Sequence, residues 1–208
     1  MDKAFGQADR PTAPAGRRSS SSEATRQRLL TAAAELIAEV GWGRVTTRAV
    51  ADRAGLPHGA VSYHFRGKQE LLGEAAMGAF ADAIPAGDFA SMSTLADFMG
   101  LVRTEIGTHE AIDPVLSRLM LETLREAERD PWLRDRMGEM LQAYRRLMVD
   151  LVRREQDRGR VSHDVSAEGL AILLGAAGDG LLMHALLDPE LDVAAALDAL
   201  ETLVVRSA

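Results

Sequence analysis

The residues with the clearest chemical potential form a short run at residues 58–65. At helical spacing Val61 and Phe65 share one face and can anchor the run to a core, which leaves Gly59 and Tyr63 on the opposite face. A small residue near the start of a helix lets its backbone approach base edges in the major groove, and Tyr63 offers apolar contact and a hydroxyl. The sides of this face carry His58, Ala60, Ser62 and His64.

Two short helices joined by a tight turn are needed to present this face. Thr46 and Thr47 offer an N-cap for the first helix, because a threonine hydroxyl accepts a hydrogen bond from a backbone N–H of the first turn. The residues at 55–57, Gly-Leu-Pro, break that helix, and the second helix follows over 58–65. This is the plan of a helix-turn-helix, whose second helix enters the major groove. A Tyr-His-Phe triplet at a helix end also occurs as plain packing, and that alternative stays open.

Longer helices are expected before and after this pair. Ser20 and Glu23 form a capping box, after which an apolar stripe predicts a helix that Gly41 ends. Residues 1–22 are rich in Pro, Ala, Gly, Ser and Arg, and we expect a flexible tail there. A further helix is predicted over residues 68–84.

The remainder of the chain also predicts helices, and no segment shows sustained alternation with a period of two. The fold class is therefore predicted to be all-α. The further helices are expected near residues 95–106, 115–124, 131–158, 166–187 and 193–205. We divide the chain into the tail at 1–22, an N-terminal three-helix domain at 23–83 and a larger C-terminal helical domain at 84–208.

Part of this sequence resembles the DNA-binding domain of the tetracycline-repressor (TetR) family, over about residues 23–83. The motifs that carry the resemblance are the run at 41–51, Ala54-Gly55-Leu56, the run at 59–65, Lys68 and Leu71-Leu72. The resemblance implies a helix-turn-helix regulator that binds operator DNA. It also implies a C-terminal helical domain with an internal ligand cavity, whose last two helices pair with those of a second subunit.

The resemblance further implies roles for single residues. Thr47 matches a phosphate-binding residue, Arg48 a position that reaches a base in some members, and Lys68 a phosphate-binding lysine. Ser62 stands where tyrosine is common, and Gly67 stands where serine is common as a helix cap, so one phosphate contact is shorter or missing and that cap is weaker. The DNA-binding residues that we predict are Thr46, Thr47, Arg48, His58, Gly59, Ala60, Ser62, Tyr63, His64 and Lys68.

Charge and composition narrow the class of protein. Residues 1–68 contain 11 Lys and Arg against 6 Asp and Glu, whereas residues 69–208 contain 13 against 25. A basic N-terminal part on an acidic body is typical of nucleic-acid contact at one end, although chance clustering gives the same pattern. The sequence has no cysteine and no apolar leader, so we expect a cytoplasmic protein without disulfides. The apolar stretch at 170–187, which contains Asp179 and His184, favours a helix buried in a protein interface over a membrane span.

Ligand-binding residues in the C-terminal part are predicted from residue type alone. Methionine side chains are deformable and suit a cavity that adapts to its ligand, although a methionine stripe is also common in plain core. The candidates are Met99, Val102, His109, Leu119, Met120, Met137, Met140, Tyr144, Met148 and Met183. Histidine and carboxylate residues do not share a helix face at metal-ligand spacing, so we predict no metal and no cofactor.

The sequence as a whole predicts a repressor that binds a palindromic operator as a homodimer through the last two helices. An unknown small-molecule effector would release it, and the helix at 68–84 would transmit the change between the domains. Two alternatives stay open. One is a DNA-binding regulator that answers to a protein partner, or an activator, without a small ligand. The other is an all-helical enzyme, which the lack of a nucleophile–base pair or metal cluster disfavours.

Overall fold

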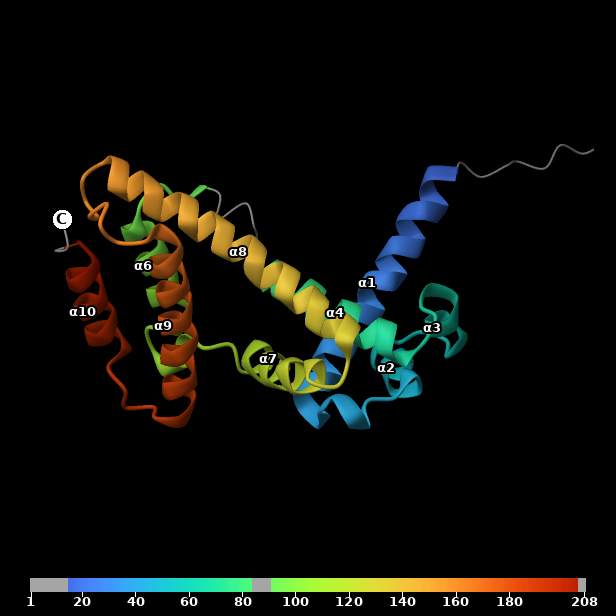
Figure 1. Ribbon diagram of the computed structural model, residues 1–208. Helices are drawn as coiled ribbons and strands as arrows, with labels where there is room; N and C mark the ends of the chain where they lie inside the picture. The colour runs from blue at the N-terminus through green and yellow to red at the C-terminus, as the bar shows by residue number, and fades with distance from the viewer. Residues whose placement is uncertain (1–14, 84–90, 206–208) are drawn as a thin grey trace, which may run out of the picture.

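The computed structural model describes residues 15–83 and 91–205, and every regular element in these ranges is a helix (Figure 1). The prediction of an all-α fold is confirmed. The α-helices are α1 (Ala15–Val40), α2 (Thr47–Arg53), α3 (Gly59–His64), α4 (Lys68–Ala83), α6 (Leu95–Ile106), α7 (Pro114–Ala127), α8 (Pro131–Asp157), α9 (Ala167–Leu187) and α10 (Val193–Val205). Two short 3-10 helices are η1 (Trp42–Arg44) and η2 (His109–Ala111).

Short polar side chains set many of the helix boundaries. Thr46 caps α2, as predicted, because its Oγ1 accepts a hydrogen bond from the backbone N–H of Ala49 at 3.1 Å. The residues that cap α6, α7, α8 and α9 in the same way are Thr94, Asp113, Asp130 and Ser166. Gly41, just after α1, has a φ of 81°, a conformation that favours glycine and turns the chain towards η1.

The start of α1 differs from the prediction. The helix begins at Ala15 and not at the capping box of Ser20 and Glu23, so residues 15–22 of the predicted flexible tail are helical. Alanine and arginine favour a helix, and no proline interrupts the stretch. The first turns of α1 extend away from the other helices (Figure 1). The rest of the predicted tail, residues 1–14, lies outside the described residues.

One apolar core lies under the N-terminal helices and extends beyond them. It joins α1, α2, α3 and α4 to α7 and to the first half of α8. Among its largest fully buried side chains are Leu29, Trp42, Leu72, Leu119 and Leu133. The boundary predicted between residues 83 and 84 therefore does not separate two cores, because α7 and the start of α8 pack on the N-terminal helices.

A second apolar core lies at the far end of the molecule. It joins α6, the second half of α8, α9 and α10, and includes Met99, Leu151, Leu174 and Leu197. The long helix α8 runs from one core to the other (Figure 1). This helix therefore contributes side chains to both cores.

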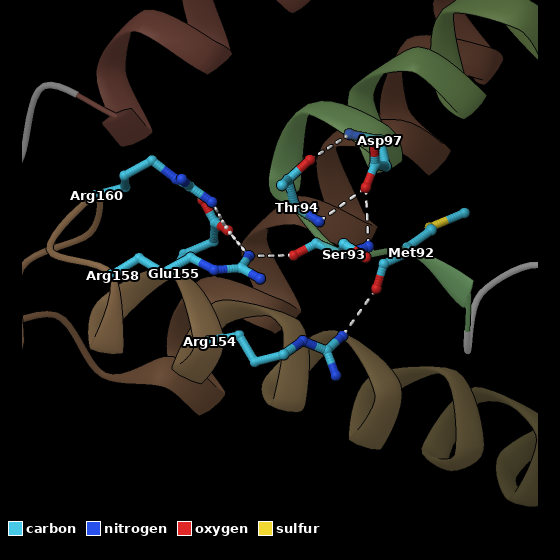
Figure 2. Close-up of polar contacts among 8 residues, drawn as sticks. All are labelled: Met92, Ser93, Thr94, Asp97, Arg154, Glu155, Arg158 and Arg160. Carbon is cyan, nitrogen blue, oxygen red and sulfur yellow. Dashed lines mark hydrogen bonds and ion pairs between the residues drawn. The ribbon is translucent and has the colours of Figure 1, made fainter.

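A buried carboxylate closes the C-terminal end of α8. The Glu155 side chain is 3% exposed and accepts hydrogen bonds from Nε and Nη2 of Arg160, each at 2.6 Å, and from Nη1 of Arg158 at 2.9 Å (Figure 2). These charge-assisted bonds, that to Arg160 first, hold the pKa of the Glu155 carboxyl below its usual range. The two arginines therefore compensate the negative charge of Glu155, which burial alone would disfavour.

The same end of α8 is fastened to the start of α6. Arg158 donates to the backbone oxygen of Ser93, and Arg154 donates to that of Met92 at 3.0 Å (Figure 2). Asp97, in the first turn of α6, accepts from the backbone N–H of Ser93 at 2.8 Å and of Thr94 at 2.9 Å. The two helices are thus held together by hydrogen bonds from arginine side chains to backbone oxygens, as well as by the second core.

We expect Glu155→Gln to destabilise the fold by about 1–2 kcal/mol at pH 7, because it leaves two guanidinium groups without their counter-charge. The pKa of Glu155 is lower in the folded state than the unfolded value of about 4.3, so its contribution is present above that value and is lost as the pH falls through the folded pKa. Urea unfolding at pH 7 and at a series of pH values below about 4.3 measures how the difference shrinks. Glu139→Gln, which removes an exposed ion pair with Arg136, is the control and should change stability little. A loss that is equal in both variants, or that does not shrink as the pH falls, would show that the Glu155 carboxylate does not stabilise the fold in this way.

Candidate nucleic-acid interface

The short helix α3 turns one face to the core and the other to solvent. Val61 and Phe65 are buried, as the sequence predicts, and they pack among the side chains of the first core. Tyr63 is 80% exposed, and Gly59 is also exposed. A large aromatic side chain that stands out from a short helix can contact a partner without any rearrangement of the core.

The turn between α2 and α3 is held from both sides. Gly55 has a φ of 64°, which favours glycine, and allows the chain to reverse there. From α1, Arg28 donates to the backbone oxygen of Ala54 and, at 3.4 Å, to that of Gly55. Across the turn, Nε2 of His58 lies 2.7 Å from Oδ1 of Asp52. The angle between the two short helices is therefore fixed by side chains as well as by the core.

The start of α2 presents hydroxyl, N–H and guanidinium groups. The Thr46 hydroxyl accepts the capping hydrogen bond from Ala49, and its own hydrogen is still available to donate. Thr47 follows at the first helical position, where backbone N–H groups lack partners within the helix. The Arg48 side chain is exposed. This set can bind an anion through Thr47 and reach further outward through Arg48.

Ion pairs fasten α2 to α1. Arg53 binds Glu39 through two bonds of 2.8 and 2.7 Å, and its Nη1 lies 3.3 Å from the carboxylate of Glu35. The hydrogen bonds from Arg53 lower the pKa of Glu39, and those from Glu39 and Glu35 raise the pKa of Arg53. These pairs are exposed, so they orient the helix more than they stabilise it.

The turn just before α2 is bound by helices from both halves of the chain. Its backbone N–H at Trp42 donates to Oε2 of Glu122, on α7, at 2.9 Å. The buried indole N–H of Trp42 donates to Gln69, on α4, at 2.9 Å. The ammonium group of Lys68 donates to the backbone oxygen of Gly43 at 3.0 Å. The position of Thr46 and the residues after it therefore depends on α4 and α7.

The remaining predicted DNA-binding residues lie on α3. Ser62 is exposed and its hydroxyl donates to the backbone oxygen of Gly59 at 3.0 Å. Ala60 and His64 are half-buried, and the His64 ring meets the Tyr63 ring edge to face with centroids 4.9 Å apart. All ten predicted residues thus belong to α3 and to the starts of α2 and α4, at the end of the molecule opposite α6, α9 and α10 (Figure 1). Their contact with DNA stays a prediction.

The predicted ligand-binding residues are divided between the two cores. Those in or against the first core are Leu119, Met120, Met137 and Met140. Those in or against the second core are Met99, Val102 and Met148. Tyr144 is half-buried on α8, where burial raises the pKa of its phenol, Met183 is 57% exposed on α9, and the side chain of His109 lies outside the described residues. As a set they do not surround one space, and their role stays a prediction.

A groove with a volume of about 950 Å³ lies between α1, α4, α7 and the start of α8. We call it the junction groove, and its lining includes Leu30, Gly78, Asp82, Leu119 and Trp132. Of the predicted ligand residues with described side chains, Leu119 alone lines it. Residue type could not reveal this groove, because its walls come from four helices that are distant in sequence.

Two family models match the chain. One, described as "Bacterial regulatory proteins, tetR family", matches residues 29–75. The other, described as "BetI-type transcriptional repressor, C-terminal", matches residues 102–207. Together they span the helix-turn-helix and most of the C-terminal helices.

Similar proteins cover nearly the whole chain. The HTH-type transcriptional repressor Rv1474c of Mycobacterium tuberculosis is 29% identical over 189 residues, which are 88% of this chain and 95% of that protein. The transcriptional regulator SCO7518 of Streptomyces coelicolor A3(2) superposes with a TM-score of 0.67 and 27% identity, covering 87% of this chain and 98% of its own. The transcriptional regulator FadR of Bacillus subtilis, solved in complex with stearoyl-CoA, gives a TM-score of 0.68 and 21% identity over 88% of this chain and 98% of its own.

We expect Glu122→Gln to loosen the turn at Trp42, because a neutral amide accepts a hydrogen bond more weakly than a carboxylate. The loss of about 1 kcal/mol should raise hydrogen exchange at the Trp42 amide about fivefold. Glu126→Gln, one turn along α7, is the matched control and should leave the exchange unchanged. Equal exchange in both variants would show that Glu122 does not hold the turn.

Proposed function

This chain belongs to the TetR family of bacterial regulatory proteins, and we propose that it represses transcription by binding a palindromic operator as a homodimer and releasing it when a small molecule binds. The matched family consists of bacterial regulatory proteins, and the similar protein of Mycobacterium tuberculosis is a transcriptional repressor. The chain is accordingly a DNA-binding transcriptional regulator. The single observation that carries the proposal is the orientation of α3, with Val61 and Phe65 buried and Tyr63 exposed. We further propose that the protein acts in the cytoplasm and is not an enzyme.

The proposed contacts follow from what each group can donate. Gly59 and Tyr63 on α3 would face base edges in the major groove, with His58 and His64 beside them. Thr47 and Lys68 would bind phosphate on either side of the groove, through a hydroxyl and an ammonium group. Arg48 would reach a base, since a guanidinium group can bind guanine through two hydrogen bonds. Phosphate contacts would set the position of α3 on the duplex, and base contacts would determine which DNA sequence is bound.

The last two helices would form the dimer interface. By length and composition α9 could cross a membrane, with a mean hydropathy of 1.8, and only 22% of that stretch is buried within one chain. The large exposed apolar side chains that the structure describes on α9 and α10 are Ile172, Leu173, Met183, Leu187 and Leu203. Two copies that bind a symmetric operator must pair through a symmetric interface, so we assign this uncovered face to a second copy rather than to lipid.

Release would work through the helices that bind the turn before α2. A ligand that binds one arrangement of α7 and α8 more tightly than another shifts the population towards that arrangement. Because Glu122 and Gln69 hold the turn at Trp42, a movement of α7 or α4 changes the separation of the two α3 helices in the dimer. Two recognition helices that no longer fit successive grooves lose affinity together.

Fluorescence anisotropy with duplexes from the promoter region beside its own gene tests the proposal. We expect nanomolar binding that weakens steeply with salt, and loss of the complex on addition of a cognate small molecule. Absence of binding to any such duplex, or binding that salt does not affect, would refute the repressor. Binding that a protein partner releases, and no small molecule does, would refute the effector.

We expect Arg48→Ala to cost about 1–3 kcal/mol of operator binding and to relax the sequence preference at one base pair. Lys68→Ala should instead weaken binding evenly across sequences and reduce the slope of log affinity against log salt by about 1. Competition assays with single-base operator variants, at several salt concentrations, measure both. If Arg48→Ala weakened all sequences alike, Arg48 would bind phosphate and not a base.

We expect Leu173→Arg to separate the dimer, because it places a charge in the apolar face of α9. Light scattering coupled to gel filtration should give half the wild-type mass, and affinity for a full palindrome should fall far more than affinity for a half-site. Leu121→Arg is the control, since Leu121 is an exposed leucine on α7 and away from that face. A dimer that survives Leu173→Arg and dissociates with Leu121→Arg would move the interface to α7.

A further inference from the structure

The junction groove has an apolar floor and the size of a small-molecule site. Leu30 and Ala34 come from α1, and Leu116 and Leu119 from α7, while Gly78 leaves open space on the α4 side. Its volume of about 950 Å³ lies in the range of sites for drug-sized ligands, about 300–1,000 Å³. The helices on its two sides belong to the DNA-binding half and to the body.

Of the four carboxylates in the groove, Glu35 and Glu74 are paired with arginines and Asp113 caps α7, which leaves one carboxylate without a partner among the described residues. Arg26 is paired with Glu74, and its guanidinium group also lies 5.3 Å from the centre of the Phe65 ring. Arg136 is paired with Glu139, outside the groove. Asp82, on α4, lines the groove and has no hydrogen-bond or ion-pair partner among the residues that the structure describes. The two cations are therefore compensated and Asp82 is not.

An aromatic ring forms the wall contributed by α8. Trp132 lines the groove and is 45% exposed. One edge of its indole packs on Gly73 of α4 so closely that a Cβ at this glycine would overlap the ring. The ring is thereby fixed in place, and it still presents surface to the groove. Tryptophan is the side chain whose face attracts cations most strongly.

We propose that the junction groove binds a bulky apolar organic cation, with Asp82 as its counter-charge and Trp132 as its aromatic wall. The surrounding body adds to the attraction, because residues 69–208 contain 25 acidic side chains against 13 basic ones. An apolar anion of the same size would make the same contacts with the apolar floor, but the acidic side chains would repel it. A preference for the cation over the anion would distinguish this groove from a cleft that binds ligands through apolar contacts alone.

The position of the groove connects the ligand to release, a step that rests on the proposed function. An occupant touches α1 and α4 on one side and α7 and α8 on the other. It would favour the separation of these helices that fits its own size, and with it one placement of the turn that Glu122 holds. The cation would thus be an effector that acts where the two halves meet.

Calorimetry with two ions of equal shape and opposite charge tests the site. Tetraphenylphosphonium should bind the full chain at least tenfold more tightly than tetraphenylborate. Asp82→Asn should weaken the cation about threefold to fivefold, as expected for one partly screened charge, and leave the anion unchanged or tighter. Asp135→Asn, an exposed carboxylate on α8 outside the groove, is the matched control and should have no effect.

Filling the groove gives a second, independent test. A Cβ at Gly78 meets nothing within 4 Å, so Gly78→Leu should fold normally and block the cation, lowering its affinity more than tenfold. Gly100→Leu, at an equally open glycine on α6, should bind the cation as the wild type does. The chain has two tryptophans, and Trp132→Phe should reduce the change in tryptophan fluorescence on binding, because Trp132 lines the groove and Trp42 does not.

Three results would overturn the site: equal or tighter binding of tetraphenylborate, full affinity in Gly78→Leu, or a fluorescence change that Trp132→Phe leaves undiminished. Operator anisotropy in the presence of tetraphenylphosphonium separates the site from the proposed function. If the chain binds no duplex at all, the repressor fails while the calorimetric result still supports the groove. If the cation binds and the operator complex is unaffected, the groove is a binding site and its role as the effector site is wrong.

Discussion

Burial of Val61 and Phe65 is the constraint on which the rest of the molecule depends. A helix as short as α3 gains little from its own hydrogen bonds, and these two apolar anchors fix its rotation against the first core. With that rotation fixed, Tyr63 must point outward. The close turn at Gly55 and the clamp from Arg28 then set the angle to α2. The chemistry of the exposed face follows from packing on the hidden one.

The first core also joins the two halves of the chain. Leu119 and Leu133 belong to α7 and α8, yet they pack on the same side chains that support α3. Glu122 adds a polar contact to the turn before α2, and α8 continues into the second core. Packed side chains therefore form a continuous path from α3 to the second core, and the proposed release would use that path.

Local patterns in the sequence predicted the helices and the orientation of α3, because caps, glycines and apolar spacing act over a few residues. Thr46, Gly41 and Val61 are examples in which the local signal was sufficient. The start of α1 was misplaced, since a capping box at Ser20 is compatible with a helix that continues through it.

Glu122 and Trp132 were missed, because their partners Trp42 and Gly73 lie far away in the sequence. Methionines chosen by type were divided between two cores, since type says nothing of which wall a side chain forms.

In the proposed repressor, paired copies of α3 read base edges in successive turns of duplex DNA. Selection of bound duplexes from a random library, followed by sequencing, tests it most directly. We expect an enriched inverted repeat whose half-sites are spaced by one helical turn, about 10–10.5 base pairs, or a multiple of it. Failure to enrich any sequence, or enrichment of a single asymmetric site without a repeat, would contradict it.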